Sequence, residues 1–181
     1  MLVIPRSSIA VIAMSVAGQA LLVEEALAQP TAPASTAATS LSSRPDRHAR
    51  NYILRAGSME LLAIRSAELA ARRSVNSRIR SAALAAIRDH TGLSKQLSFA
   101  GRRLNILPSA ALLPEHQQAL LYLINSADFD ATYVRQRRIE SKNAYRLHRE
   151  YLRTGTSPTL RPVAQRAAAA LYSELERLGR L

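Results

Sequence analysis

Four side chains that can ligate a metal ion fall in four separate predicted helices. They are Glu60, His90, Glu140 and Glu174. Each lies on the inward stripe of its helix, and ferritin-like di-metal sites are built from inward carboxylates and histidines on facing helices. Three carboxylates and one imidazole would suit iron or a hard cation. The pattern therefore predicts a metal site inside a helical bundle as one candidate function.

The same residues also allow an interpretation without a metal. Di-iron proteins carry Glu-x-x-His on two helices, which places two ligands one turn apart. No glutamate of this chain is followed by histidine three residues later. A modest rotation would place Glu60, Glu140 and Glu174 at the rim of the bundle, paired with arginine. An unpaired carboxylate in the core is costly, so any glutamate that points inward needs a partner.

The chain shows no pattern typical of an enzyme. It has no Gly-rich phosphate loop, no serine nucleophile elbow and no His-x-x-x-His helix. Asp89-His90 and Glu115-His116 are sequence neighbours, but adjacent residues on a helix do not face each other, so neither pair easily forms an acid–base unit. We expect His48 and His148 on the surface. The sequence predicts a protein that is not an enzyme and has no cofactor, apart from the metal ion of the alternative.

The elements that must position these residues are helices, because the chain is rich in Ala, Leu and Arg. Apolar spacing predicts an all-α fold with helices over 46–74, 77–105, 115–125, 129–153 and 158–180. The second has the most regular stripe, which includes Leu93 and Leu97. Short connections, and one long crossover carrying the short helix between long helices two and three, favour an antiparallel, ferritin-like four-helix bundle. Gly92 and Gly101 are interpreted as close-packing points.

Two registers compete in the third long helix. One stripe runs through Phe129, Tyr133, Gln136, Glu140, Asn143, Leu147 and Tyr151 (or Glu150). The other runs through Val134, Ser141, Tyr145, His148 and Leu152. The prediction that Glu140 faces the interior depends on the first of these registers.

The first 28 residues have the pattern of a secretory signal peptide. Arg6 precedes an apolar run over 9–23, and the small residues of Ala26-Leu27-Ala28 follow. The run is short for a membrane span, which needs roughly 20 apolar residues, although a retained signal-anchor is the alternative. We therefore expect cleavage near Ala28, a periplasmic or secreted protein, and no transmembrane span in the mature chain. Residues 29–45, rich in Ala, Ser, Thr and Pro, are predicted to be a disordered linker to a domain over 46–181.

The net charge of +12 predicts a cationic surface. Such a surface attracts anions such as phospholipid head groups and lipopolysaccharide phosphates, which makes an anionic envelope component the expected partner. Aromatic residues make up only 4% of the chain, so few platforms exist for stacking bases, and we expect no nucleic-acid partner. The absence of cysteine excludes disulfides and thiolate metal sites.

Several motifs resemble the bacterial "domain of unknown function 4142" family. They include Met59-Glu60-Leu61, Asp89-His90-Thr91, Phe129-Asp130-x-x-Tyr133 and Leu147-His148-x-x-Tyr151. The resemblance implies a secreted, ferritin-like four-helix protein of the periplasm or outer membrane, with no established activity. Members usually carry a histidine in the third long helix and another in the last. The matching positions here are Ser141 (or Lys142) and Glu174, so this chain keeps only His90 of that set.

Together these observations predict a non-enzymatic, secreted helical bundle with an envelope interaction or stress-related role. Two alternatives follow from the residues already described. The first is a metal-binding ferritin-like bundle that uses Glu60, His90, Glu140 and Glu174. The second is a protein that binds anionic lipid or lipopolysaccharide.

Overall fold

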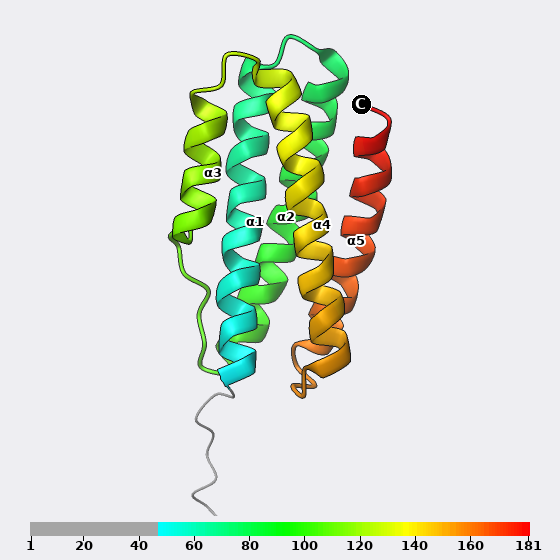
Figure 1. Cartoon of the computed structure of the whole chain (residues 1–181). Helices are drawn as coiled ribbons and strands as arrows, with labels where there is room; N and C mark the ends of the chain where they lie inside the picture. The colour runs from blue at the N-terminus through cyan, green and yellow to red at the C-terminus, as the bar shows by residue number, and fades with distance from the viewer. Residues whose placement is uncertain (1–46) are drawn as a thin grey trace, which may run out of the picture. The chain divides into compact units, whose positions relative to one another are not determined.

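The computed structural model describes residues 47–181, and every regular element in that range is a helix (Figure 1). The helices are α1 (Arg47–Arg73), α2 (Ser77–Arg103), α3 (Pro114–Ile124), α4 (Phe129–Thr154) and α5 (Arg161–Gly179). None of them combines the length and apolar character that crossing a bilayer requires. The signal peptide predicted for 1–28 and the linker predicted for 29–45 lie outside the described residues.

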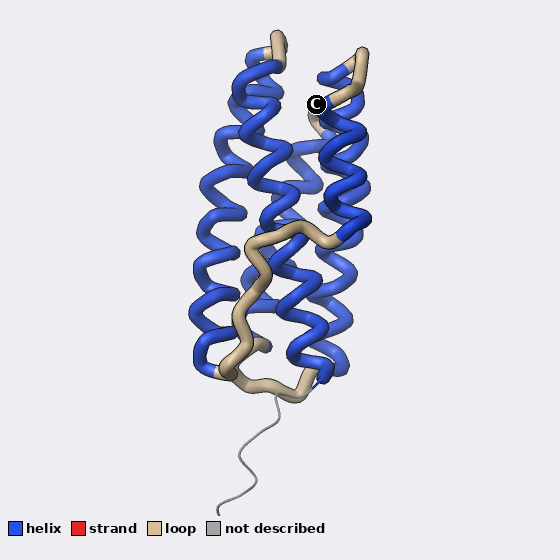
Figure 2. Tube along the Cα trace, turned by 90° about the vertical axis from the view of Figure 1, so that its left-hand side faces the viewer, coloured by secondary structure: helices blue, strands red, loops and turns tan. Residues whose placement is uncertain are grey.

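The four long helices form an antiparallel bundle in which α1 packs against α2 and α4, while α5 packs against α4 and α2 (Figure 1). A long crossover follows α2 and climbs along the side of the bundle before α3 begins (Figure 2). The short α3 then lies against α1 and α4. The crossover and α3 together return the chain to the far end of the bundle, so α2 and α4 run in the same direction (Figure 1). The predicted fold class is confirmed.

Local sequence signals fix the starts of several helices. The Asn76 side chain accepts hydrogen bonds from the backbone N–H groups of Arg78 and Ile79, which caps α2. Asp128 caps α4 in the same way by accepting from the Ala131 N–H. Pro114 occupies the first turn of α3, where its missing N–H costs nothing.

Two glycines let the crossover lie directly on the bundle. A Cβ atom at Gly57 of α1 would lie 2.7 Å from the Cβ of Pro108, so no larger residue fits there without a shift. At Gly101 of α2 a Cβ would collide with the carbonyl oxygen of Ile106. The predicted close packing is thus confirmed at Gly101. It is wrong at Gly92, where a Cβ would meet open space.

The apolar core consists of two clusters. One contains Ile53 of α1, Leu97 of α2 and Tyr151 of α4. The other contains Ala67 of α1 and Ala83 of α2, together with residues of α3 and α4. Along α1 and α2 these residues repeat at heptad intervals, which is the spacing of a seam between nearly antiparallel helices. The position midway between the two clusters on each helix is polar, and it belongs to the site described below.

Leu97 tests the register of α2. It is 2% exposed, whereas Leu84 on the same helix is 51% exposed. We expect Leu97→Ala to lower the free energy of unfolding by about 2–5 kcal/mol, because it leaves a cavity in the core. The matched change Leu84→Ala should stay within about 0.5 kcal/mol. Urea unfolding followed by circular dichroism measures both, and equal losses would show that the α2 register is wrong.

Candidate functional site

Three of the four predicted ligands meet in the centre of the bundle. Glu60 of α1, His90 of α2 and Glu174 of α5 are 2%, 4% and 6% exposed. The His90 Nδ1 atom lies 2.7 Å from Glu60 Oε2, and its Nε2 atom lies 3.3 Å from Glu174 Oε2. Glu60 follows Ile53 by one heptad, and His90 precedes Leu97 by one heptad. The seam that builds the apolar clusters therefore also places these polar groups in one layer.

Glu140, the fourth predicted ligand, does not join them. It is partly exposed on the face of α4 that lines a surface cleft. The layer instead receives Arg137 and Ser141 from α4, which are 2% and 0% exposed. Arg137 Nη2 donates to Glu174 Oε1 at 2.7 Å, and Ser141 Oγ donates to Glu174 Oε2 at 2.9 Å. An inward arginine neutralises a buried carboxylate, whereas an inward Glu140 would have added a third one.

The observed register of α4 lies between the two predicted alternatives. Its buried residues are Thr132, Tyr133, Val134, Arg137, Ser141, Ala144, His148 and Tyr151. The first stripe is right at Tyr133 and Tyr151 but wrong in the middle, where Gln136, Glu140 and Asn143 were expected inside. The second stripe is right at Val134, Ser141 and His148. We call Glu60, His90, Arg137, Ser141 and Glu174 the polar layer.

Charge balance explains why the polar layer is stable. Burial opposes protonation of His90, but attraction to Glu60 and hydrogen bonds to both carboxylates raise its pKa to about 9. Burial alone would raise the pKa of Glu174, yet Arg137 and His90 hold it well below its usual range. With His90 protonated, two cations face two carboxylates. The charges of the layer therefore cancel without help from solvent.

The two cations of the polar layer lie close together. Arg137 Nη2 is 3.0 Å from His90 Nε2, and both atoms carry hydrogens when the histidine is charged. Their repulsion lowers the pKa of His90, although the carboxylates outweigh it. Glu174 offsets the contact because one of its oxygens accepts from Arg137 and the other lies within reach of His90. Glu174 of α5 thus contacts polar groups of both α2 and α4.

A second buried histidine extends the layer toward the apolar cluster that contains Ile53 and Tyr151. His148 is 2% exposed, so the prediction of a surface position is wrong. Its Nδ1 atom lies 2.9 Å from the hydroxyl oxygen of Tyr52, and its Nε2 atom lies 4.0 Å from Glu60 Oε1. Burial lowers the pKa of His148 to about 4 and raises that of Tyr52, so Tyr52 donates to a neutral imidazole.

The polar layer as built is poorly suited to a cation. Within residues 47–181 no group of three or more His, Asp or Glu side chains has an arrangement that could hold a metal ion. A metal ion would need lone pairs from His90 Nε2 and the Glu174 carboxylate. The positively charged Arg137 guanidinium already lies against both of these groups. The crevice that reaches these residues between α2 and α5 has no room for a water molecule. Metal binding by Glu60, His90, Glu140 and Glu174 stays a prediction, and it would require Arg137 to move.

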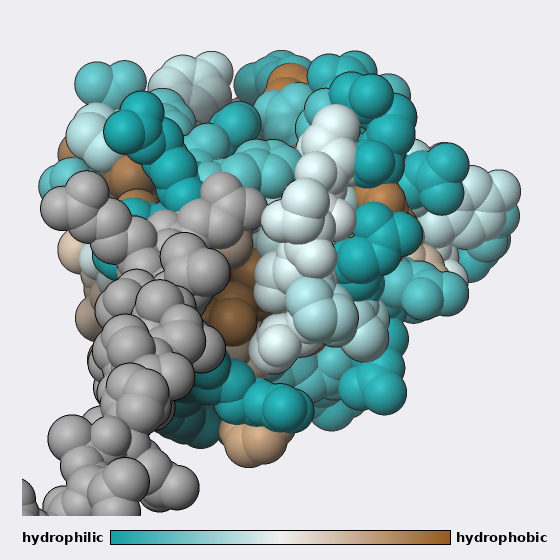
Figure 3. All heavy atoms as spheres, turned by 90° about the horizontal axis from the view of Figure 1, so that it is seen from below, coloured by the Kyte–Doolittle hydropathy of each residue, from teal (hydrophilic) through white to brown (hydrophobic). Residues whose placement is uncertain are grey.

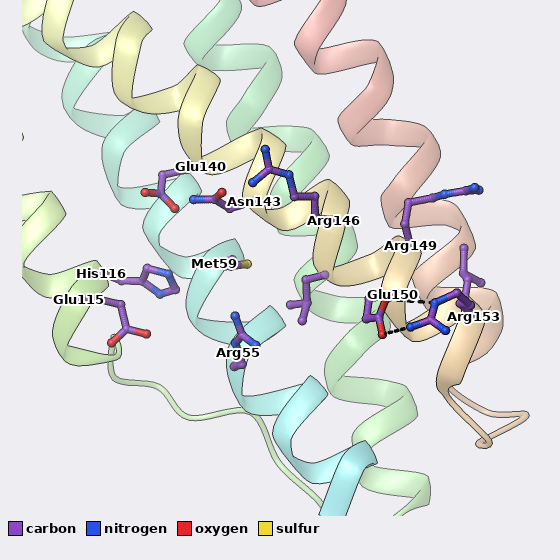
Figure 4. Close-up of a pocket in the computed structure, with 12 residues that line it drawn as sticks. Arg55, Met59, Glu115, His116, Glu140, Asn143, Arg146, Arg149, Glu150 and Arg153 are labelled. Carbon is purple, nitrogen blue, oxygen red and sulfur yellow. Dashed lines mark hydrogen bonds and ion pairs between the residues drawn. The ribbon is translucent and has the colours of Figure 1, made fainter.

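A larger hollow opens on the surface between α1, α3 and α4, with a volume of about 1160 Å³. We call it the α1/α3/α4 cleft (Figure 4). Its charged and polar lining residues are Arg55 of α1, Glu115 and His116 of α3, and Glu140, Asn143, Arg146, Arg149, Glu150 and Arg153 of α4. Met59, Leu147 and Leu152 supply its apolar surface. A cleft of this size can accommodate a small organic ligand.

His116 is the buried polar group of the α1/α3/α4 cleft. It is 5% exposed, and its Nδ1 atom lies 2.6 Å from Ser58 Oγ. Ser58 Oγ also accepts a hydrogen bond from the Leu113 N–H at 2.8 Å. The same serine therefore ties the start of α3 to α1 and orients His116.

The sequence did not reveal this cleft. In the sequence, Glu115 and His116 are recognisable only as neighbours along the chain. The arginines of the cleft are recognisable only as contributors to the net charge. The one signal that could have found it is the spacing of Arg146, Glu150 and Arg153, which share one face of α4. That face is assigned only after Arg137 and Ser141 have fixed which side of α4 points inward.

The comparisons with known proteins agree with this architecture. The family model described as "Domain of unknown function (DUF4142)" matches residues 30–181. A DUF305 fragment from Deinococcus radiodurans is 17% identical with a TM-score of 0.64, covering 75% of this chain and 98% of that one. CopM in its Cu(II)-bound form is 16% identical with a TM-score of 0.63, covering 73% and 93%. At such identities the likeness shows the fold alone. A search of curated proteins gives no match.

Removal of Arg137 tests the charge balance of the polar layer. Arg137→Met keeps a long apolar stem but leaves Glu174 with less positive charge nearby, and we expect it to cost about 3–5 kcal/mol of unfolding free energy. The matched change Arg177→Met breaks an exposed ion pair with Asp89 and should cost at most about 1 kcal/mol. Urea unfolding at neutral pH measures both. Equal costs for the two variants would contradict the account.

Proposed function

The chain belongs to the DUF4142 family, and on that premise we propose that it is a non-enzymatic binding protein of the cell envelope that recruits an anionic partner. The family carries a domain of unknown function, so the proposal rests on the chemistry of this chain. Its interaction surface is the cationic exterior of the bundle. A stress-related role in the envelope would be one use of such binding.

The observation that carries the proposal is the excess of arginines that have no carboxylate partner. Within residues 47–181 only Arg137, Arg153 and Arg177 form ion pairs with carboxylates. The other arginines of that part have no carboxylate oxygen within 4.0 Å. Unpaired surface cations produce a positive potential that attracts anions and speeds their encounter. A partner rich in phosphate groups, such as anionic lipid or lipopolysaccharide, fits that surface.

The surface seen from the end where α1 begins is mostly hydrophilic, with a few hydrophobic patches (Figure 3). Such a surface suits a protein that stays in water while it contacts charged head groups.

The inside of the bundle supports a binding role over catalysis. The crevice between α2 and α5 leaves no room for a water molecule beside His90 and Glu174, and both side chains already have hydrogen-bonding partners inside the polar layer.

The envelope location rests on the first 28 residues, whose pattern is typical of a secretory signal peptide. Metal binding is the second proposal, because Glu60, His90 and Glu174 do converge and the similar CopM structure holds Cu(II). It is the weaker of the two, because Arg137 already neutralises the carboxylate that a metal would need.

Vesicle binding tests the proposed function. We expect the full-length protein to sediment with phosphatidylglycerol vesicles but not with phosphatidylcholine vesicles, because each arginine near an anionic surface contributes about 1 kcal/mol. Raising the salt from about 0.1 M to about 1 M shortens the screening length from about 10 Å to about 3 Å and should weaken binding at least ~tenfold. Binding that is absent, or that salt does not change, would argue against an electrostatic role.

A further inference from the structure

The charges of the α1/α3/α4 cleft are separated instead of mixed. Glu115, His116 and Glu140 lie on the side of the cleft nearer to α3, Arg146 and Arg153 lie on the side farther from it, and Arg55 of α1 lies between them (Figure 4). Glu150 lies on the arginine side as well, but Arg153 neutralises it through an ion pair of 2.6 Å. The cleft therefore has an acidic side and a basic side.

The remaining charged groups are left without ion-pair partners. Within the described residues, Arg55 and Arg146 have no carboxylate oxygen within 4.0 Å, and Glu115 and Glu140 have no cationic nitrogen within that distance. Opposite charges that line one cleft without pairing are available to a third molecule. A ligand that satisfies all of them must itself carry a negative and a positive group.

Each side of the cleft has a chemistry suited to one of these groups. A guanidinium such as that of Arg55 or Arg146 binds phosphate through parallel hydrogen bonds. His116, whose Nδ1 atom lies within hydrogen-bond distance of Ser58 Oγ, is one further polar group of the cleft. Two carboxylates suit an ammonium group, which has three hydrogens to donate and accepts none. The half-buried Met59 and Leu147 provide apolar surface for a short carbon spacer.

We propose that the α1/α3/α4 cleft binds a small zwitterion with a phosphate and a primary ammonium group, of which phosphoethanolamine is the simplest. Arg55 and Arg146 hold the phosphate, while Glu115 and Glu140 hold the ammonium group. The inference rests on the proposed function, since it names the chemical class of partner and the place where it binds. The group is recognised either as a free molecule or as the head group of a lipid.

Calorimetry on the full-length protein tests the cleft. Phosphoethanolamine should bind at least ~tenfold more tightly than inorganic phosphate or ethanolamine alone, since each half satisfies only one side. Arg55→Gln and Glu140→Gln should each weaken binding ~tenfold or more. The matched changes Arg103→Gln and Glu176→Gln lie on exposed positions outside the cleft and should leave affinity unchanged. Unchanged melting temperatures would show that the variants remain folded.

Three results would overturn the inference. They are no binding of phosphoethanolamine, equal binding of inorganic phosphate, and equal loss in the cleft variants and the controls. Vesicles containing phosphatidylethanolamine in phosphatidylcholine separate the two sources. Capture by these vesicles that Arg55→Gln abolishes supports a lipid head group, and binding of phosphoethanolamine without capture supports the free molecule.

The same variants separate this inference from the proposed function. Salt-sensitive binding to phosphatidylglycerol vesicles without any binding of phosphoethanolamine would overturn the cleft and leave the proposed function standing. Binding of phosphoethanolamine that depends on Arg55 and Glu140, without any binding to phosphatidylglycerol vesicles, would support the cleft and overturn a general cationic surface as the recruiting element.

Discussion

The pairing of two buried cations with two buried carboxylates constrains the whole bundle. Charges removed from water are stabilised only if their partners are close and well oriented, and removal of one partner is far more costly than loss of an exposed pair. Glu60, His90, Arg137 and Glu174 come from four different helices. These contacts form only when each long helix has one particular rotation about its own axis and one particular position along the bundle axis. We regard the polar layer as the feature that sets the register, while the two apolar clusters supply most of the burial.

The polar layer and the surface cleft are linked through α4. Arg137 and Ser141 point inward, and this places Glu140 and Arg146 in the lining of the α1/α3/α4 cleft. If Glu140 had faced the interior, the cleft would have lost a carboxylate and the core would have gained an unbalanced charge. The interior therefore determines which side chains the exterior can offer to a ligand. The crossover that packs on Gly57 completes the cleft by bringing α3 alongside α1.

The parts of the fold that the sequence predicted are those with a regular apolar repeat. The seam of α2, with Leu93 and Leu97, repeats throughout the helix, so His90 was correctly placed inside. In α4 the inward positions include an arginine, a serine and a histidine, and no hydrophobicity pattern distinguishes these from surface residues. The burial of Arg137 and His148 is explained only by the carboxylates that face them, which are Glu174 and Glu60 respectively. The cleft was beyond prediction because it depends on the path of the crossover, which has no periodicity.

The central claim is that the polar layer is neutral because His90 is protonated. Nitrogen-15 NMR of the imidazole rings tests it directly, because protonated and neutral ring nitrogens have different chemical shifts. We expect His90 to carry both ring protons at neutral pH and to lose one near pH 9, while His148 stays neutral until the pH falls to about 4. A His90 that is neutral at pH 7.5, with an ordinary pKa near 6.5, would contradict it.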